Sequence, residues 1–298
     1  MTDSRSDAGA LLRALAVPRL VGTPNHAQVR ERLKAELTAR GFVVEEHVFA
    51  GRPSWMLFGT PTVVRGVNLI GRRPTAQPPN RPTVWLAAHY DSKGQPISMA
   101  TRILGAAALV TGALATVAAI VPALVLWAVG LAILAANRVT DRSAGALDNA
   151  TGLVAILAIL DSLPKGADVG VLFLDAEEYG LVGARALVTE RPDLLRDGAV
   201  INFDSLDDRG GCLTFLHRPG PLGQAVAAEL GGIRGRWLPV VVDGIALARG
   251  PVRECVTIMK GGWGTARVVH TPRDTADRLT LDAVRQVAAG VARALSAR

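Results

Sequence analysis

Acidic and imidazole side chains recur where the apolar, strand-like segments of this chain end. The run VGVLFLDAEE, residues 169–178, has no helical periodicity and ends in the adjacent carboxylates Glu177 and Glu178. Such a run predicts a strand buried on both faces of a parallel sheet, and the helix-like LVGARALV follows it. The loop between such a strand and its helix lies at the crevice where α/β sheets bind ligands. Two carboxylates there favour a positively charged ligand.

Other strand-like segments end in the same kind of residue. His89 and Asp91 follow TVWLAA, Asp204 follows AVINF, and His270 follows a β-branched pair. Asp148 directly precedes the helix-like segment GLVAILAIL. Taken singly, an aspartate is typical of a helix cap or turn, and a lone histidine is usually an ordinary hydrogen-bonded residue. Together these side chains form a set of oxygen and nitrogen donors suited to zinc or a similar divalent ion.

The order of these motifs resembles that of peptidase family M28, the di-zinc aminopeptidases. The motifs are HYD at 89–91, LDNATG at 147–152, AEE at 176–178, NFD at 202–204 and VHTPRDT at 269–275. The N-terminal stretch 18–42 and the segment EEYGLVGARAL, 177–187, are also similar to the family. The resemblance covers nearly the whole chain, apart from one insertion.

The resemblance implies a role for each metal-binding side chain. His89 and Asp204 would hold one zinc ion, and Glu178 and His270 would hold a second, with Asp148 bridging the two. Two metal ions about 3.5–4 Å apart can share a hydroxide and polarise a scissile carbonyl group. The implied cofactor is therefore a pair of zinc ions.

The resemblance also implies two catalytic residues that are not metal ligands. Glu177 would be the general base, which takes a proton from water and passes it to the leaving amine. Asp91 would orient His89, because a metal-bound imidazole normally donates its other N–H group to an acceptor. Hydrolysis of peptide substrates from the amino end is the activity that follows.

Two departures from the family pattern concern substrate preference. Val269 stands where many members have a tyrosine before the last histidine, and the loop ALARGPVREC lacks the Ser-Asp pair common there. Three functions remain open: an aminopeptidase acting on short peptides, a related zinc amidohydrolase or glutaminyl cyclase, and a non-catalytic binding protein on the same fold.

The alternation of strand-like and helix-like segments predicts the fold class. We expect a single α/β domain over residues 1–298, with a mostly parallel sheet flanked by helices on both faces, as in zinc exopeptidases. One helix is expected from about residue 10 to Gly41, and a closing helix over 281–297 with Thr280 as its cap. The length fits one large domain.

Charge and cysteine content narrow the partners and the compartment. The net charge is +7 and the isoelectric point about 10.2, but the arginines are scattered without a dense basic run. Nucleic-acid binding is therefore not expected, and attraction to anionic lipid is the better use of this charge. Cys212 and Cys255 imply no disulfide framework. The first residues lack the apolar core of a signal peptide, so secretion is not expected.

An apolar insertion, residues 98–143, separates His89 from Asp148. It contains no charged residue over 103–136, a length that suits a membrane segment. Both ends must return to one metal site, so we expect a helical hairpin, either transmembrane or re-entrant, that turns at Pro122.

Positive residues flank the insertion and indicate its orientation. Arg102 precedes the apolar stretch, and Arg138 and Arg142 follow it, which favours a catalytic domain on the cytoplasmic side of a membrane. The alternative is a helical pair that packs on the domain itself, and homo-oligomerisation stays open.

Overall fold

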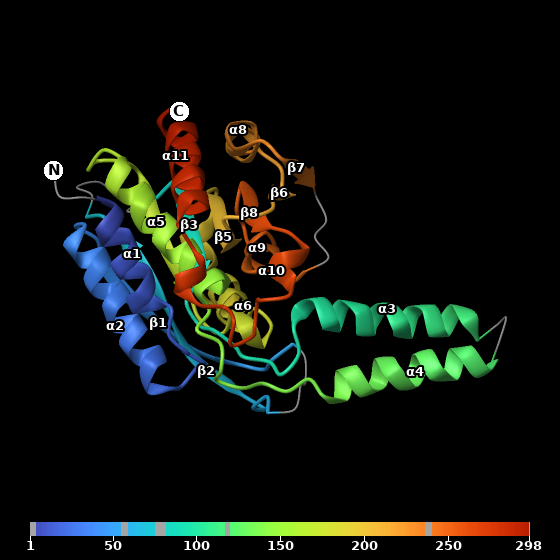
Figure 1. Ribbon diagram of the computed structural model, residues 1–298. Coiled ribbons are helices and arrows are strands. Elements are labelled where there is room, and N and C mark those ends of the chain that lie inside the picture. The colour runs from blue at the N-terminus through green and yellow to red at the C-terminus, as the bar shows by residue number, and fades with distance from the viewer. Residues whose placement is uncertain (1–3, 55–58, 75–81, 117–119, 236–239, 298) are drawn as a thin grey trace.

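A mixed eight-stranded sheet lies at the centre of the protein (Figure 1). The computed structural model describes residues 4–54, 59–74, 82–116, 120–235 and 240–297. The strands are β1 (Val43–Gly51), β2 (Val64–Arg72), β3 (Val84–His89), β4 (Val169–Leu174), β5 (Ala199–Leu206), β6 (Gly211–Arg218), β7 (Ile233–Gly235) and β8 (Glu254–Gly261). Their spatial order is β1-β2-β4-β3-β5-β8-β6-β7.

The prediction of a mostly parallel sheet is confirmed only in part, because antiparallel pairs at the edges join the parallel ones in a mixed sheet. The central strands β4, β3, β5 and β8 run parallel to one another. β1 pairs antiparallel with β2, β2 with β4, and β6 with β8. The difference has a physical reason. An unbroken apolar run marks burial on both faces of a sheet, but it carries no information about the direction of the neighbouring strand.

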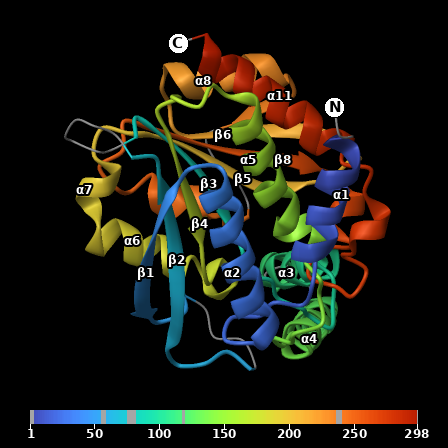
Figure 2. The same cartoon turned by 90° about the vertical axis from the view of Figure 1, so that its left-hand side faces the viewer.

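Helices cover both faces of the sheet, as predicted (Figure 2). One face packs against α1 (Ser4–Leu15), α2 (Pro24–Ala39), α5 (Thr151–Ser162), α8 (Pro221–Leu230) and α11 (Asp282–Ser296). The other face packs against α6 (Val182–Glu190), α7 (Pro192–Leu195) and α9 (Asp243–Leu247). In β4, Val171 and Phe173 belong to the first cluster and Leu172 and Leu174 to the second. Alternate side chains of a strand thus fill two cores.

The predicted helix ends need two corrections. The expected helix from about residue 10 to Gly41 is two helices, and α2 starts after Thr23, whose side chain accepts a hydrogen bond from the His26 N–H. Gly41 follows α2 with φ +78°, as its predicted role at the helix end requires. At the C-terminus, α11 begins at Asp282. Leu281 precedes it with a left-handed φ of 67°, so Thr280 is not the cap.

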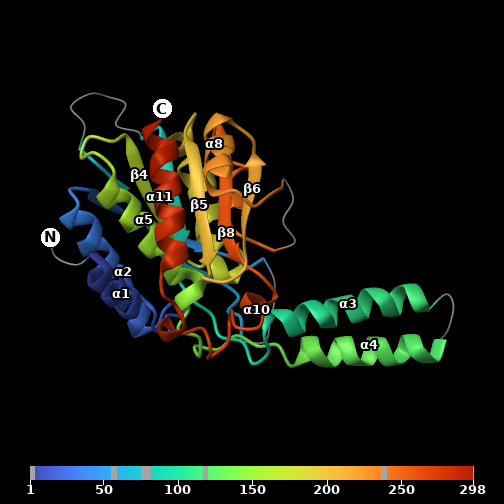
Figure 3. The same ribbon diagram turned by 45° about the horizontal axis from the view of Figure 1, so that its top comes forward.

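The insertion forms two helices, α3 (Met99–Ala115) and α4 (Ile120–Ala135), which lie side by side and extend away from the sheet (Figures 1 and 3). Pro122 is not the breaker, since it lies in the first turn of α4, where a proline needs no hydrogen-bonding N–H. Among the described residues, none of the helices has the length and apolar content needed to cross a bilayer. The transmembrane form of the predicted hairpin is therefore not supported.

Short loops tie the hairpin to the sheet domain. We call residues 92–95 and 137–143 together the hairpin foot. The backbones of Gly94 and Thr140 exchange two hydrogen bonds, with N···O distances of 2.7 and 2.8 Å. The Gln95 side chain donates to Asn137 Oδ1 at 2.7 Å. Both ends of the hairpin are thereby held together where they leave the domain.

Candidate metal centre

The sheet places most of the predicted site residues at one edge. His89 is the last residue of β3, and Glu177 and Glu178 lie in a short 3-10 turn that begins three residues after the end of β4. Asp204 lies in the second half of β5. Because these three strands are parallel neighbours, their carboxyl ends meet at the same edge. Loops from two further parts of the chain complete the site.

Those loops carry the remaining predicted ligands. Asp148 lies in the irregular turn Ala146–Ala150 ahead of α5. The buried Asp274 fixes that turn, because its carboxylate accepts hydrogen bonds from the Leu147 N–H at 2.7 Å and the Asp148 N–H at 3.2 Å. His270 follows α10 (Trp263–Ala266) in a turn, with a left-handed φ of 65°.

Two groups of metal-binding atoms share one carboxylate. His89, Asp148 and Asp204 offer ligand atoms within 4.8 Å of one another, and so do Asp148, Glu178 and His270. Asp148 Oδ1 lies 3.0 Å from His89 Nε2, while its Oδ2 lies 2.9 Å from His270 Nε2. Asp148 thus turns one oxygen to each group. A carboxylate that bridges two metal ions needs this arrangement.

Asp91 connects the first histidine to the two glutamates. Its side-chain oxygen Oδ1 lies 3.4 Å from His89 Nδ1, and its carbonyl oxygen lies 3.2 Å from the same atom. Its carboxylate also accepts hydrogen bonds from the N–H groups of Glu177 and Glu178, each at 3.1 Å. With Nδ1 facing these acceptors, Nε2 of His89 is the nitrogen left for a metal ion.

Burial and nearby charges shift the pKa values of the carboxyl groups in the cluster. Burial, followed by the charge of Asp148, raises the pKa of Asp204 to about 7. Burial raises the pKa of Glu177 well above the ordinary range of a glutamate. At Asp148 burial acts in the same direction, but contacts with His270 and His89 outweigh it and the pKa lies well below its usual value. A divalent cation would relieve this crowding of carboxylates.

Two buried ligand atoms that lack hydrogen-bond partners in the described structure also fit a divalent cation. Glu178 Oε1 and His270 Nε2 are buried and make no hydrogen bond within the described part of the chain. His270 Nε2 nevertheless lies 3.0 Å from Glu178 Oε2, so the two atoms converge without hydrogen-bond geometry. Convergent carboxylate and imidazole atoms without hydrogen-bond partners are suited to zinc.

Three charged residues near the site were missed by the sequence analysis. Lys93 is buried, and its Nζ lies 3.0 Å from both Glu178 Oε2 and the Glu178 carbonyl oxygen. Asp243, at the start of α9, is also buried. Neither of its carboxylate oxygens has a hydrogen-bond partner among the described residues, and burial raises its pKa well above the usual range. Lys93 lies two residues after the HYD motif, so its position was a usable signal, whereas Asp243 lies outside every motif.

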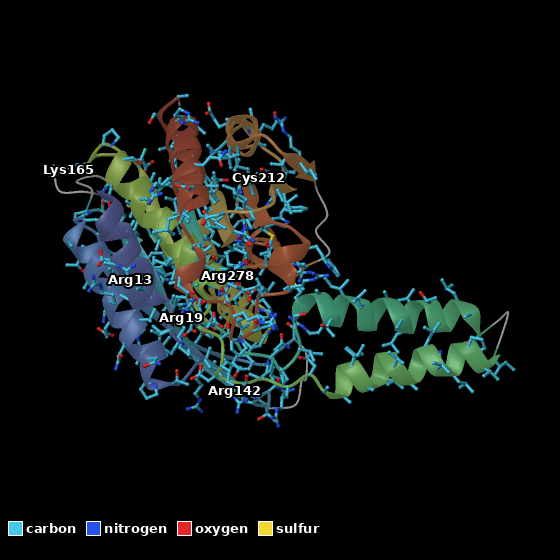
Figure 4. All side chains as sticks on the ribbon, viewed as in Figure 1. Arg13, Arg19, Arg142, Lys165, Cys212 and Arg278 are labelled. Atoms are coloured by element: carbon cyan, nitrogen blue, oxygen red, sulfur yellow. The ribbon has the colours of Figure 1, made fainter. Side chains whose placement is uncertain are left out.

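The third missed residue, Arg19, supports the loops behind the cluster. Its guanidinium is fully buried and donates to the carbonyl oxygens of Tyr90 at 2.7 Å and Gly145 at 2.9 Å. It also donates to the Ala144 carbonyl oxygen. Arg19, which Figure 4 labels, therefore joins the segment after His89 to the segment before Asp148.

Strands ending in a shared cluster of carboxylates and imidazoles, with helices on both faces, define an α/β domain of the metallopeptidase type. A sequence model of peptidase family M28 matches residues 68–233, more than half of the chain, and the chain belongs to this family. No curated protein sequence matches the chain.

Solved structures share the fold at low sequence identity. A glutaminyl cyclase from Porphyromonas gingivalis is 18% identical with a TM-score of 0.67, over 99% of this chain and 98% of that one. The aminopeptidase from Aneurinibacillus sp. strain AM-1 is 12% identical with a TM-score of 0.65, over 98% and 93%. A zinc aminopeptidase from Bacillus subtilis is 12% identical with a TM-score of 0.65, over 98% and 95%.

Proposed function

We propose that the protein is a di-zinc aminopeptidase that removes amino-terminal residues from short peptides. The observation that carries this proposal is Asp148, which directs one oxygen to each of two groups of metal-binding atoms. His89 and Asp204 would hold one zinc ion, and Glu178 and His270 the other. Bound zinc supplies the Lewis acid that polarises a carbonyl group and lowers the pKa of water.

The remaining residues have roles in moving and orienting protons. Glu177 belongs to neither group of metal-binding atoms, and its raised pKa suits a base that accepts a proton and returns it to the leaving amine. Asp91 holds His89 and the backbone of both glutamates in place.

The test compares peptides that differ only at their amino end. Purified enzyme should release the first residue of a free peptide, and an acetylated copy should resist cleavage. Chelation should abolish the activity and zinc should restore it. Equal cleavage of the acetylated peptide would contradict the aminopeptidase assignment and favour a zinc amidohydrolase.

A glutaminyl cyclase is the second candidate function. The observation in its favour is that glutaminyl cyclases from Porphyromonas gingivalis and Fimbriiglobus ruber, at 18% and 17% identity, share the fold as fully as the aminopeptidases do. A peptide with amino-terminal glutamine separates the two functions. Mass spectrometry would show loss of ammonia for a cyclase and loss of a whole residue for an aminopeptidase.

We further propose that the hairpin attaches this activity to a membrane, with the catalytic domain on the cytoplasmic side. The support is the charge-free stretch 103–136 between Arg102 and Arg138. Replacing residues 103–136 with a short Gly/Ser linker, which keeps the hairpin foot, should move the protein from the membrane fraction to the soluble fraction. A wild-type protein that fractionates as a soluble homo-oligomer would contradict membrane attachment.

A further inference from the structure

The two helices of the hairpin bury small residues and expose large ones. The buried residues of α3 and α4 are Ala100, Gly105, Gly112, Ala123 and Gly130. Leu104, Val110, Leu114, Val121, Leu124 and Leu131 are all more than half exposed, up to 73% for Leu114. A helix pair in water buries its large apolar side chains, so this hairpin has the reverse distribution.

The helix contact itself depends on glycine. A Cβ atom on Gly130 would lie 2.6 Å from the Leu109 side chain and 3.0 Å from the Gly105 carbonyl oxygen. A Cβ atom on Gly105 would lie 2.7 Å from Ile133. Close approach at small residues, with large apolar residues turned outward, is the packing found between helices surrounded by lipid.

Lipid fits the exposed side chains better than a second copy of the chain does. The side chains of α3 and α4 project on both outer sides of the pair (Figure 4), whereas a dimer partner would cover one side. Exposed arginines, Arg138 and Arg142, follow α4 where the chain returns to the domain, and attract anionic headgroups. Trp263 is 46% exposed on α10, which packs against α3, and tryptophan is typical of the membrane interface.

The start of the apolar segment lies next to the metal centre. Arg102 Nη2 lies 2.6 Å from His270 Nδ1, and the Gln95 N–H donates to the His270 carbonyl oxygen at 2.7 Å. The charge-free stretch begins at Ile103, the residue after Arg102. One helical turn rises about 5 Å. Lipid that covers the charge-free stretch therefore ends within about one turn of Arg102, which contacts His270.

We propose that the hairpin enters a bilayer up to Arg102 and Arg138 and holds the metal centre at the level of the lipid headgroups. The preferred substrates are then peptides whose apolar part lies in the same bilayer and whose amino terminus reaches the site. The substrate class rests on the proposed aminopeptidase function, whereas the position of the hairpin does not. Confinement to one surface raises the effective concentration of enzyme and substrate without any new contact between them.

The experiment uses the full-length wild-type protein and two variants with matched changes. The hairpin variant carries Leu104→Gln, Leu114→Gln and Leu131→Gln, at side chains that the helix contact does not bury. The control carries Val43→Gln, Val48→Gln and Ile233→Gln, which are equally exposed on the sheet domain. Flotation with phosphatidylglycerol/phosphatidylcholine vesicles should recover the wild type and the control but not the hairpin variant.

Depth is measured by quenching of tryptophan fluorescence with brominated lipids. The difference between wild type and Trp263→Phe should show that Trp263 is quenched by bromine near the headgroups and not by bromine near the chain ends. No quenching of Trp263, or flotation of the hairpin variant, would overturn the proposed position. Burial of the exposed hairpin side chains in a dimer that forms without vesicles would also overturn the proposed position.

The substrate class is measured with two peptides of identical sequence, one carrying a carboxyl-terminal alkyl chain. With vesicles present, kcat/KM for the anchored peptide should exceed that for the free peptide on the order of tenfold or more. The hairpin variant should lose this ratio while keeping its rate on the free peptide. Flotation without any preference for the anchored peptide would overturn the substrate class alone. Cleavage of neither peptide by the wild type would contradict the proposed function, and the quenching result would still decide the position.

Discussion

Glu177 and Glu178 are neighbours in the chain but lie in different electrostatic environments. Burial opposes ionisation of both carboxyl groups. At Glu178 the charges of His270 and Lys93 outweigh burial and lower the pKa to about 2, whereas at Glu177 burial prevails and the pKa rises well above its usual value. Glu178 is thus suited to stay an anionic ligand, and Glu177 to gain and lose a proton.

Replacement of Glu177 separates metal binding from catalysis. Glu177→Gln keeps the shape of the side chain but cannot accept a proton, so we expect kcat to fall at least about 100-fold, as is usual for loss of a general base. The zinc content of the variant, measured by atomic absorption, should equal that of the wild type. Near-wild-type turnover in Glu177→Gln would refute the role of this residue.

Asp204 makes the stability of the metal-free protein depend on pH. Its pKa is about 7 in the folded protein, against about 3.9 for an aspartate in an unfolded chain. The folded state therefore binds this proton more tightly, and the stabilisation is lost as the pH rises from about 4 to about 7. In EDTA, the melting temperature should fall over this range, and Asp204→Asn should flatten the fall. An unchanged pH dependence in the variant would contradict the assignment.

Arg19 is the central tie between the elements around the site. It joins the loop after β3 to the loop before α5 through buried hydrogen bonds to carbonyl oxygens. Arg19→Met would leave those acceptors buried and without a partner, and should lower the free energy of unfolding by about 3 kcal/mol or more. Urea denaturation would measure this loss. Arg13→Met, at an exposed position of α1, is the control and should change stability by less than about 0.5 kcal/mol.

Elements whose side chains are buried could be predicted from the sequence. Strand direction and contacts between distant parts of the chain could not. The apolar runs located β3, β4 and β5, and the charged residues at their ends supplied the candidate ligands. Strand direction at β2 and β6 has no such signal, which is why the sheet was predicted mostly parallel. The turn of the hairpin was assigned to Pro122, yet a proline in the first turn of a helix is compatible with that helix.

Site residues with long-range partners were harder to predict than the ligands. Arg19 lies in the family-like stretch 18–42 and Asp243 in no motif, and both acquire a role only when the fold brings them to the cluster. Asp274 lies in the motif VHTPRDT, but its contact with the turn at Asp148 is visible only in the folded structure. The assignment of metal ligands stays a prediction for the zinc measurements to decide.

Zinc should stabilise the whole molecule, because the proposed ligands come from β3, the turn after β4, β5 and two distant loops. An ion bound only by the folded chain adds about 2.7 kcal/mol at a free concentration of 100 times its dissociation constant. The melting temperature of the chelated protein should therefore rise as zinc is added. Asp148→Ala, which removes the shared ligand, should abolish the rise, and the surface variant Glu229→Ala should keep it. A zinc-induced rise that persists in Asp148→Ala would contradict the shared site.

The backbone hydrogen bonds between Gly94 and Thr140 lower the entropic cost that the insertion adds to folding. A disordered loop in place of α3 and α4 would have to be closed against its own entropy before His89 could meet Asp148, and that cost grows with loop length. Two adjacent antiparallel helices pack by local contacts alone, and this packing brings together the two ends that join the sheet domain. A hairpin that forms early therefore shortens the effective distance along the chain between the ligands. Removal of the hairpin should therefore leave the rate at which the metal centre assembles nearly unchanged, whereas unfolding of the hairpin should slow it.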